Sequence, residues 1–297
     1  MTIMARPRRR ASAPTDRARR RGRPLVYAIL IVTSAAMIAP MVWALSSSLK
    51  RPEDVFASGS GVVPSPSTLQ AYRDVFTLLP FGHYLVNSLV VTGSVVLSNA
   101  LFDLCAAYAF AKLKFPGRNA LFGLLMITLT VPMQVNLIPL YRMMVWVHER
   151  IPALGADTLS GIIAPSAIQV FGIFLMRQFF ATIPDSIIEA ARLDGASELR
   201  ILFRVILPIS LPGLATVTIF TFLNSWNDFL WPMIVSSSDS SRTLPVGLAL
   251  LSRKNTVNWP DTMAGAVIAA VPMILVFLIL QRRFVEGLTA GSVKDVA

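Results

Sequence analysis

The chain has 297 residues, of which 54% are hydrophobic and 14% charged, and its mean hydropathy of +0.62 is typical of a polytopic membrane protein rather than a soluble domain. The formal net charge is +11, but nine of the 27 Lys and Arg residues fall within residues 1–23, so the basic residues do not form a nucleic-acid-binding face. The single cysteine, Cys105, and two widely separated histidines, His83 and His148, exclude a disulfide framework and argue against a metal site.

The chain begins with a basic segment, residues 1–24, which contains prolines and almost no large apolar side chains. This composition predicts a disordered cytoplasmic tail that sets membrane topology, in preference to a nucleic-acid or specific lipid ligand. The next 21 residues, 25–45, carry no charge and would be about 31 Å long as a helix, enough to span a bilayer. The region is too long for the apolar part of a signal peptide, and we interpret it as a retained anchor.

Five further spans are predicted along the chain, at residues 84–111, 119–145, 159–180, 207–235 and 263–280. The prolines at 132, 139, 165, 212 and 272 are compatible with spans whose neighbours satisfy the freed carbonyl groups. The predicted fold is therefore an all-α integral membrane protein with six transmembrane helices. Its organisation is a basic tail (1–24), a six-span transmembrane domain (25–286) and a short tail (287–297).

The distribution of Lys and Arg tests this topology. Nineteen lie in segments 1–24, 112–118, 177–204 and 281–297, and eight lie in the intervening segments 46–83, 141–157 and 236–262. Because cytoplasmic loops carry the excess of basic residues, both termini and the 177–204 segment are predicted to be cytoplasmic.

Residues 184–208, PDSIIEAARLDGASELRILFRVILP, form the most charged segment between two spans. Seven charges lie between Pro184 and Arg204, and each Asp or Arg at a bilayer centre costs roughly 2.5–3.5 kcal/mol. Pro184 suits the first helical position, Gly195 the end of that helix, and Ser197 the cap of a second short helix. The apolar faces predicted for the two helices are Ile187, Ile188 and Ala191, followed by Ile201, Leu202 and Val205. The pattern predicts a helix–turn–helix outside the membrane.

Two spans carry polar stripes. In 84–111 the stripe comprises Ser88, Thr92, Asn99 and Asp103, and Asp103 either faces a cavity or joins helices by hydrogen bonding; both interpretations stay open. In 207–235 the stripe comprises Thr218, Thr221, Ser225 and Asp228, with Asn224 beside it. The run NSWNDFLWP (224–232) combines amides, a carboxylate and indoles, as carbohydrate sites do; the alternative is an aromatic belt with helix-capping groups. The predicted substrate-pathway residues are Asp103, Thr221, Asn224, Ser225, Asn227 and Asp228.

Several motifs carry a resemblance to a known family. Glu189-Ala190-Ala191, Gly195 and Val205-Ile206-Leu207-Pro208 match the pattern EAA-x3-G-x9-I-x-L-P, with Val205 in place of Ile. With this pattern, KFPGR (114–118), IPLY (138–141), FGIFLMRQFF (171–180), WNDFLWP (226–232) and GLTAGSVK (287–294), the chain resembles the MalG-type carbohydrate permeases of binding-protein-dependent ABC importers, from residue 25 onward.

The resemblance implies a type I ABC importer permease fold in which cytoplasmic coupling helices, 184–206, dock on an ATPase subunit. The implied ATPase-coupling residues are Glu189, Ala190, Ala191, Asp194, Gly195 and Pro208. The implied C-terminal ATPase contact comprises Gly287, Thr289 and Gly291. The loop 236–262 occupies the position from which such permeases contact the solute-binding protein.

The chain contains no G-x4-G-K-[ST] motif for nucleotide phosphates, so it is not expected to be an ATP-hydrolysing enzyme. The resemblance implies no cofactor in this chain, with ATP and Mg²⁺ held by two ATPase subunits. The other implied partners are a second homologous permease, an external solute-binding protein and the lipid bilayer, and no nucleic acid. The expected function is import of a carbohydrate or related polyol derivative across the cytoplasmic (inner) membrane.

Two other functions compete with this one. A secondary transporter or channel would use Asp103 and Asp228 as ion or proton carboxylates, and its uptake would follow an ion gradient. A membrane scaffold would recruit a cytoplasmic complex through 184–208 without moving a solute. The EAA-x3-G spacing and the GLTAGSVK ending favour the importer.

Overall fold

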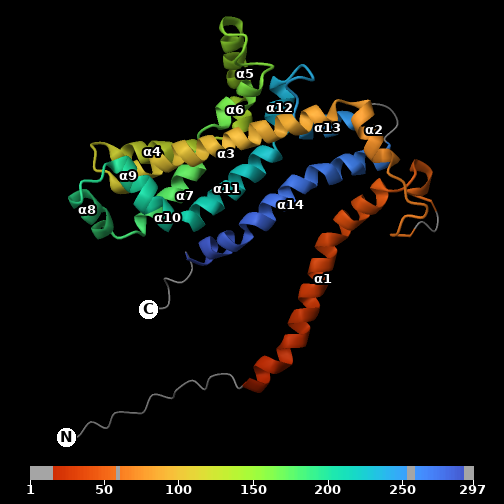
Figure 1. The fold of residues 1–297 in the computed structure, drawn as a ribbon, viewed down its shortest axis with the longest axis horizontal. Helices are drawn as coiled ribbons and strands as arrows, with labels where there is room; N and C mark the ends of the chain where they lie inside the picture. The colour runs from red at the N-terminus through yellow and green to blue at the C-terminus, as the bar shows by residue number, and fades with distance from the viewer. Residues whose placement is uncertain (1–15, 58–60, 253–257, 291–297) are drawn as a thin grey trace.

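The computed structural model describes residues 16–57, 61–252 and 258–290, and in these ranges the chain forms helices and connecting segments without a strand. Three helices are long: α1 (Asp16–Ser48), α3 (Phe81–Lys112) and α14 (Trp259–Ala290) (Figure 1). Each contains a stretch long and apolar enough to cross a membrane, namely Val26–Ser48, Phe81–Lys112 and Trp259–Arg282. Three of the six predicted spans are thus single helices.

The helix α1 begins at Asp16, so residues 16–24 are helical where the sequence predicted a disordered tail. Five of these nine residues are Arg, a strong helix former, and the stretch extends the apolar helix toward the N-terminus. Residues 1–15 lie outside the described part of the chain. At the other end, residues 287–290, predicted as a tail, continue α14.

The other three predicted spans are bent. The helices α4 (Arg118–Thr128) and α5 (Met133–Arg150) meet at 97°; α4 ends at Thr128, and Pro132 is the N-cap of α5. The pair Leu159–Ser166 and α7 (Val170–Ala181) is bent by 41°, and the segments Glu198–Ile209 and Leu211–Val235 meet at 86°. The chain therefore has up to six spans when each bent pair is one span.

Short helices lie in two of the segments between the predicted spans. Residues 46–83 contain the 3₁₀ turn η1 (Pro52–Asp54) and the amphipathic helix α2 (Gln70–Leu78), and residues 236–262 contain α13 (Leu244–Leu251). The remaining short elements are α6 (Leu159–Ile163), the 3₁₀ turn η2 (Ala164–Ser166) and α12 (Leu230–Val235).

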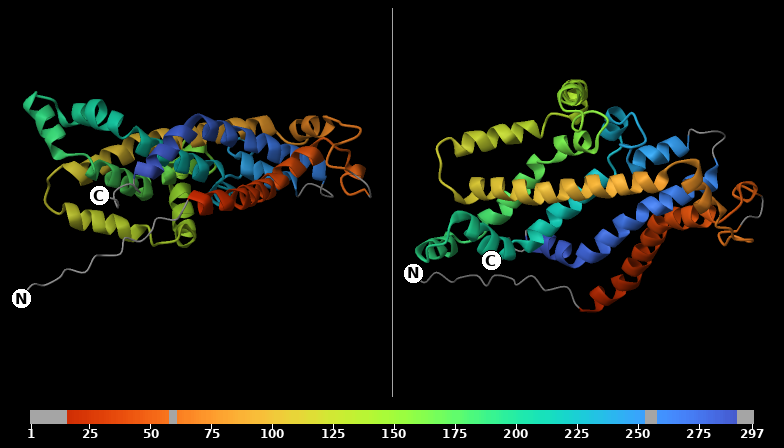
Figure 2. Two further views of the ribbon diagram at one scale, coloured as in Figure 1. Left: turned by 90° about the horizontal axis from the view of Figure 1, so that it is seen from below. Right: turned by 45° about the horizontal axis from the view of Figure 1, so that its top comes forward.

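The helix α3 lies at the centre of the packing and contributes to all three apolar clusters. Phe81 and Tyr84 pack with α2, α13 and α14; Val91 and Val95 pack with α5, α6 and α12; Leu104 packs with α7 and the 184–208 region. The views of Figure 2 show α3 running the length of the molecule, with α4 and α5 at one side. In contrast, none of the residues in the most apolar window of α1 is buried.

Candidate functional site: the 184–208 helices and the polar stripes

The predicted helix–turn–helix is present at residues 184–208. It consists of α8 (Asp185–Leu193), α9 (Glu198–Ile201), a π-helical turn η3 (Leu202–Ile206) and α10 (Leu207–Ile209). Gly195 has φ = +76°, the left-handed conformation that lets the chain reverse between α8 and α9. Pro184 is the N-cap of α8 rather than its first residue, and Ser197 caps α9 by position without a side-chain capping bond.

One face of this unit is anchored on the bundle. Ile188, Ile201, Leu202 and Ile206 are each at most 2% exposed and pack with residues of α3 and α7. The prediction that Ile187 shares this face is wrong, since Ile187 is exposed and Ile188 with Ala191 face inward. In a nine-residue helix that touches the bundle along one stripe, the adjacent Ile187 lies off the contact line.

Three of the seven charges are paired within the chain. Lys112 Nζ lies 2.6 Å from Asp185 Oδ1, and Arg192 Nε lies 2.7 Å from Glu198 Oε1. The hydrogen bond from Lys112 lowers the pKa of Asp185, and that from Arg192 lowers the pKa of Glu198. Asp185, Arg192 and Glu198 are therefore used within the chain.

The remaining charged groups define an open surface, which we call the docking face. Its members are exposed, and the charged ones make no ion pair among the described residues: Glu189, Leu193, Asp194, Arg200 and Arg204. Leu193 is 89% exposed. Of the other predicted coupling residues, Ala190, Gly195 and Pro208 are exposed, while Ala191 is half-buried against the bundle.

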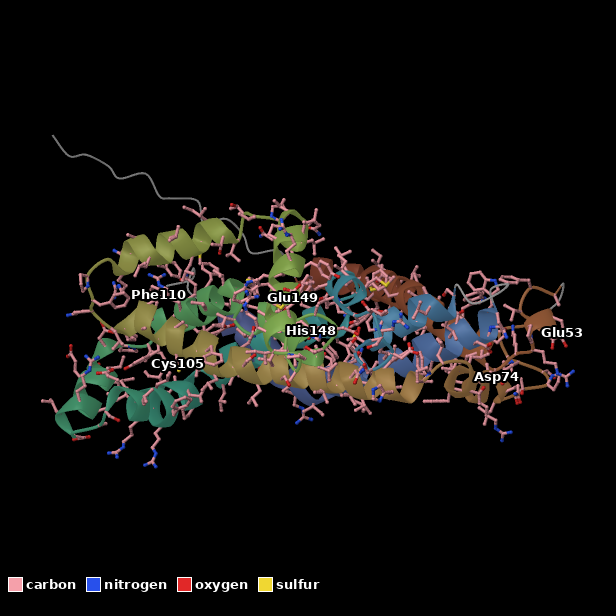
Figure 3. All side chains as sticks on the ribbon, turned by 90° about the horizontal axis from the view of Figure 1, so that it is seen from above. Glu53, Asp74, Cys105, Phe110, His148 and Glu149 are labelled. Carbon is pink, nitrogen blue, oxygen red and sulfur yellow. The ribbon has the colours of Figure 1, made fainter. Side chains whose placement is uncertain are left out.

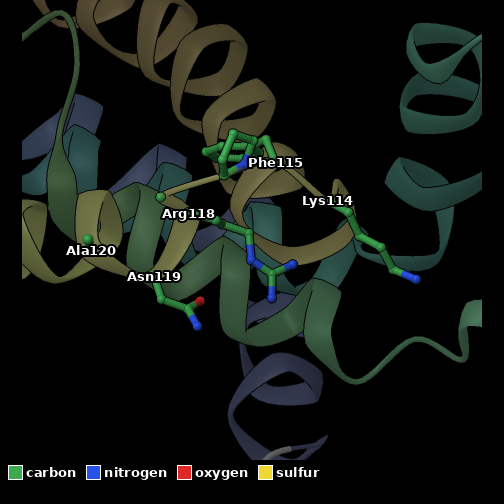
Figure 4. Close-up of a pocket in the computed structure, with 7 residues that line it drawn as sticks. Lys114, Phe115, Arg118, Asn119 and Ala120 are labelled. Atoms are coloured by element: carbon green, nitrogen blue, oxygen red, sulfur yellow. The ribbon is translucent and has the colours of Figure 1, made fainter.

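A basic turn lies at the same end of α3. Residues 114–120 line an open depression of about 500 Å³ (Figure 4), in which Gly117, at φ = +78°, is the N-cap of α4. The Arg118 guanidinium donates to the carbonyl of Leu113, at 3.1 Å. This is the KFPGR turn of the sequence.

The polar stripe of α3 joins helices to one another. Ser88 Oγ accepts from the backbone N–H of Leu244 at 2.8 Å, and Asn99 Nδ2 donates to the carbonyl of Ser166 at 2.7 Å. Asp103 Oδ1 accepts from the backbone N–H of Gln169 at 3.0 Å. All three side chains are buried, so this geometry favours the helix-joining interpretation of Asp103 over a cavity-facing one.

The stripe after Leu211 is divided between buried and exposed positions. In α11 (Leu211–Trp226), Thr221 is buried and Ser225 Oγ donates to Thr92 Oγ1 at 3.3 Å, whereas Asn224 and Asn227 are exposed. Asp228 lies two residues before α12, whose N-cap is Phe229, and its carboxylate faces the backbone N–H groups of Leu230 and Trp231, the first two residues of that helix. The Asp228 side chain thus serves the first N–H groups of α12 from outside the N-cap position.

The two indoles of WNDFLWP are not open platforms for a sugar ring. Trp226 is 2% exposed and donates to the carbonyl of Ala269 at 3.0 Å, and Trp231 is 0% exposed and donates to that of Gly161 at 3.1 Å. Buried indoles with satisfied N–H groups are core residues. The expectation that these rings cover a carbohydrate does not hold in this conformation.

A small polar cavity lies where the two stripes meet. Its volume is about 10 Å³, and its polar lining consists of Ser88, Thr92, Ser166, Ser225, Asp228 and Thr243. That volume accommodates about one water molecule. Ser225 and Asp228 reach this cavity, and Asp103, Thr221, Asn224 and Asn227 do not line it.

The opposite end of the molecule holds a hydrogen-bonded loop that sequence reasoning missed. Asp157 adopts φ = +56°, and its Oδ1 accepts from the backbone N–H groups of Ser237 and Ser238 at 2.8 and 2.9 Å and from Ser241 Oγ at 2.5 Å. Burial raises the pKa of Asp157, but these hydrogen bonds outweigh it and hold the pKa at about 2. The serine-rich run 236–241 was the available signal.

Metal-binding groups do not gather in the part of the chain that the structure describes: no three His, Cys, Asp or Glu side chains come together. Cys105 lies in α3, while His148 and Glu149 lie in α5 (Figure 3). Of the predicted C-terminal contact, Gly287 and Thr289 fall within α14 and Gly291 lies outside the described residues.

Comparison with known proteins shows which family has this architecture. Residues 104–289 match the family "Binding-protein-dependent transport system inner membrane component". The arabinooligosaccharides transport system permease protein AraQ of Halalkalibacterium halodurans is 32% identical over 283 residues, 93% of this chain and 99% of that protein. The sn-glycerol-3-phosphate transport system permease protein UgpE of Pectobacterium atrosepticum is 31% identical over 270 residues, 88% of this chain and 94% of that protein.

The fold also has a solved counterpart. A chain of a bacterial ABC transporter involved in the import of the acidic polysaccharide alginate superimposes with a TM-score of 0.80 at 24% identity, over 92% of this chain and all of that one. The likeness confirms the all-α permease fold. Together with the family match and the 184–208 helices, it leads to one conclusion: the chain belongs to the family of binding-protein-dependent transport system inner membrane components.

Proposed function

We propose that the chain is the permease subunit of an ATP-driven importer that moves a carbohydrate or related polyol derivative delivered by a solute-binding protein. The observation that carries the proposal is the 184–208 helical unit, which is anchored by one side on an apolar bundle and presents the docking face on the other. A transporter that lacks a nucleotide-phosphate motif needs such a surface to receive energy from another subunit.

The proposed partners follow from the surfaces. Two ATPase subunits hold ATP and Mg²⁺, and one of them binds the docking face through Glu189, Leu193 and Asp194. A second, homologous permease and the lipid bilayer cover the exposed apolar side chains of α1, α4 and α5. In this arrangement both termini are cytoplasmic, and the C-terminal contact with the ATPase pair includes Gly287 and Thr289.

The proposed mechanism is a population shift between two permease conformations. Closure of the ATPase pair on ATP moves the docked α8, and the bundle follows because Ile188 and Ile201 are buried in it. The state favoured by this movement differs in which end of the passage is open. The cavity of about 10 Å³ fits the closed passage of this conformation, which a sugar cannot enter.

The substrate class rests on the relatives. One relative is named for arabinooligosaccharides, another for sn-glycerol 3-phosphate, and the structural counterpart for alginate. All three are polyhydroxylated. The exposed amides of Asn224 and Asn227 are suited to hydroxyl groups, and the second permease would complete the passage.

Reconstitution of the assembled importer in liposomes tests the proposal. Uptake of radiolabelled arabinotriose, sn-glycerol 3-phosphate and an alginate oligosaccharide is measured with the solute-binding protein outside and ATP or ADP inside. Uptake of one probe only with ATP supports the proposal. Uptake that follows a proton or sodium gradient without ATP, or no flux of any probe in an assembled complex, contradicts it.

A further inference from the structure

The helix α3 holds both ends of the docking helix α8. At the start of α8, Lys112 Nζ donates to Asp185 Oδ1 and to the carbonyl of Ile183, each at 2.6 Å. Beyond its end, the Tyr108 hydroxyl donates to Glu198 Oε2 at 2.6 Å. Tyr108 and Lys112 are four residues apart and thus share one face of α3.

Glu198, the partner of Tyr108, also fixes the angle between α8 and α9. Glu198, the first residue of α9, accepts from Arg192 of α8 at both oxygens, at 2.7 Å from Nε and 3.2 Å from Nη2. A bidentate guanidinium–carboxylate pair defines orientation as well as distance. Tyr108, Arg192 and Glu198, which we call the polar clasp, therefore join α8, α9 and α3 at one carboxylate.

The residues of α3 that hold the 184–208 segment are buried. Tyr108 is 3% exposed, its ring packs edge-on against Phe180 at 6.3 Å between centroids, and the Lys112 side chain is 5% exposed. A buried phenol and a buried ammonium group both need polar partners, and here the 184–208 segment supplies them. Movement of the 184–208 segment away from α3 would leave both groups without these partners.

At its other end, α3 is bonded to the loop that follows α12. Tyr84 donates to Asp239 Oδ1 at 2.6 Å, and Asn87 Nδ2 donates to the carbonyls of Ser240 and Arg242, each at 2.9 Å. The 32 residues of α3 form one continuous helix, about 48 Å long. The path along the chain itself is interrupted, because a π-helical turn and an 86° bend separate α9 from α11.

We propose that α3 is the element that couples the docking face to the opposite end of the permease, and that Tyr108 is the positioning residue that transmits the movement of α8 to it through Glu198. This inference rests on the proposed function. It differs from a path in which residues 197–208 pass the movement directly into the span that follows them. The span that follows the 86° bend, α11, moves after α3 does, because it packs on α3.

Tyr108→Phe tests the proposal because it removes one hydroxyl and keeps the ring against Phe180. In the reconstituted importer, the number of solute molecules taken up per ATP hydrolysed is measured with the probe that the wild type transports. We expect that ratio to fall at least about fivefold while assembly with the ATPase subunits and basal ATP hydrolysis are unchanged. Glu198→Gln, which weakens the pair with Arg192, is expected to lower the ratio in the same way.

Tyr27→Phe, on the exposed surface of α1, is the matched control and should leave the ratio unchanged. A Tyr108→Phe importer with the wild-type ratio would overturn the proposal, as would an equal fall in the control. A wild-type complex that shows no ATP-dependent uptake would instead contradict the proposed function. A Tyr108→Phe chain that fails to assemble is replaced by Glu198→Gln, whose wild-type ratio would equally overturn the proposal.

Discussion

The carboxylate of Asp103 in α3 lies directly against the backbone of Gly172 in α7: a Cβ added to Gly172 would stand 2.2 Å from Oδ2. Asp103 is 1% exposed, and its carboxylate is held in place because Oδ1 accepts from the backbone N–H of Gln169. We expect Gly172→Ala to destabilise the chain by about 1–3 kcal/mol, as overpacking does in a closely packed core. The measurement is the unfolding temperature of the detergent-purified protein.

Gly93→Ala is the control for that prediction. Gly93 also lies inside a long helix, but a Cβ there meets nothing within 4 Å. Alanine has a higher helix propensity than glycine, so this variant should be neutral or more stable by up to about 1 kcal/mol. Equal unfolding temperatures for the two variants would show that α3 and α7 are not in close contact at Asp103.

How much the sequence could predict differs between the helices. Charge-free stretches such as 25–45 predict their helices directly, since hydrocarbon excludes charge and requires internal backbone pairing. The bend at Pro132 was beyond prediction, because a proline in a span is compatible with either a kink or a break. The apolar helix α13 was missed for a related reason: eight residues are too few to span, and the surrounding residues are polar.

The candidate site likewise has features that the sequence predicts and features that it does not. The position of the turn at Gly195 follows from local chemistry, and the structure has it there. The partners of Arg192 and Asp103 could not be predicted, because they are set by which helices pack together. Asn99 and Asp103 contact the 166–169 segment, more than 60 residues away in sequence. Asp157 and its serine partners, about 80 residues apart, are a further case.

The Asp157 carboxylate is predicted to hold the 236–241 loop in place. Asp157→Asn keeps a side chain that tolerates positive φ and removes the charge that accepts these hydrogen bonds. We expect hydrogen exchange at the Ser237 and Ser238 amides to quicken by about tenfold or more, equivalent to about 1.4 kcal/mol. Asp74→Asn, in α2, is the control and should leave both amides unchanged.

The stabilisation of the loop by Asp157 is predicted to be lost at low pH. The pKa of Asp157 is about 2 in the folded chain and 3.8 ordinarily, so the ionised group stabilises the loop above pH about 4. The contribution is lost as the pH falls from about 4 through 2. Protection of the Ser237 amide, corrected for intrinsic exchange, should thus be constant between pH 5 and 7. A loss of protection near pH 6 would rule out Asp157 as the controlling group.

Gly195 is predicted to be required for its left-handed backbone conformation, and not because a larger side chain at this position would clash with a neighbour. A Cβ at this position meets nothing within 4 Å, yet a residue other than glycine in the left-handed region costs about 1–2 kcal/mol. Gly195→Ala should therefore lower ATP-dependent uptake several-fold, whereas Gly195→Asn should keep most of it, because Asn tolerates positive φ. Uptake that is equally impaired in both variants would point to contact with the ATPase subunit instead.

The exposed and buried polar residues near the meeting of α3 and α11 should respond differently to mutation. Thr92 is 1% exposed and accepts from Ser225, so Thr92→Val should lower the stability of the chain by about 1 kcal/mol. Asn224 is exposed, with an amide free to meet a solute or the second permease. Asn224→Ala should leave the unfolding temperature unchanged and raise the apparent KM of uptake several-fold.

The control is Asn119→Ala, an exposed amide in α4 at the opposite end of α3, which should change neither quantity. An unchanged KM in Asn224→Ala, with a lower unfolding temperature, would assign Asn224 to packing. In that case the hydroxyl groups of the substrate must be met by the second permease, because the two indoles of this region are already buried and hydrogen-bonded.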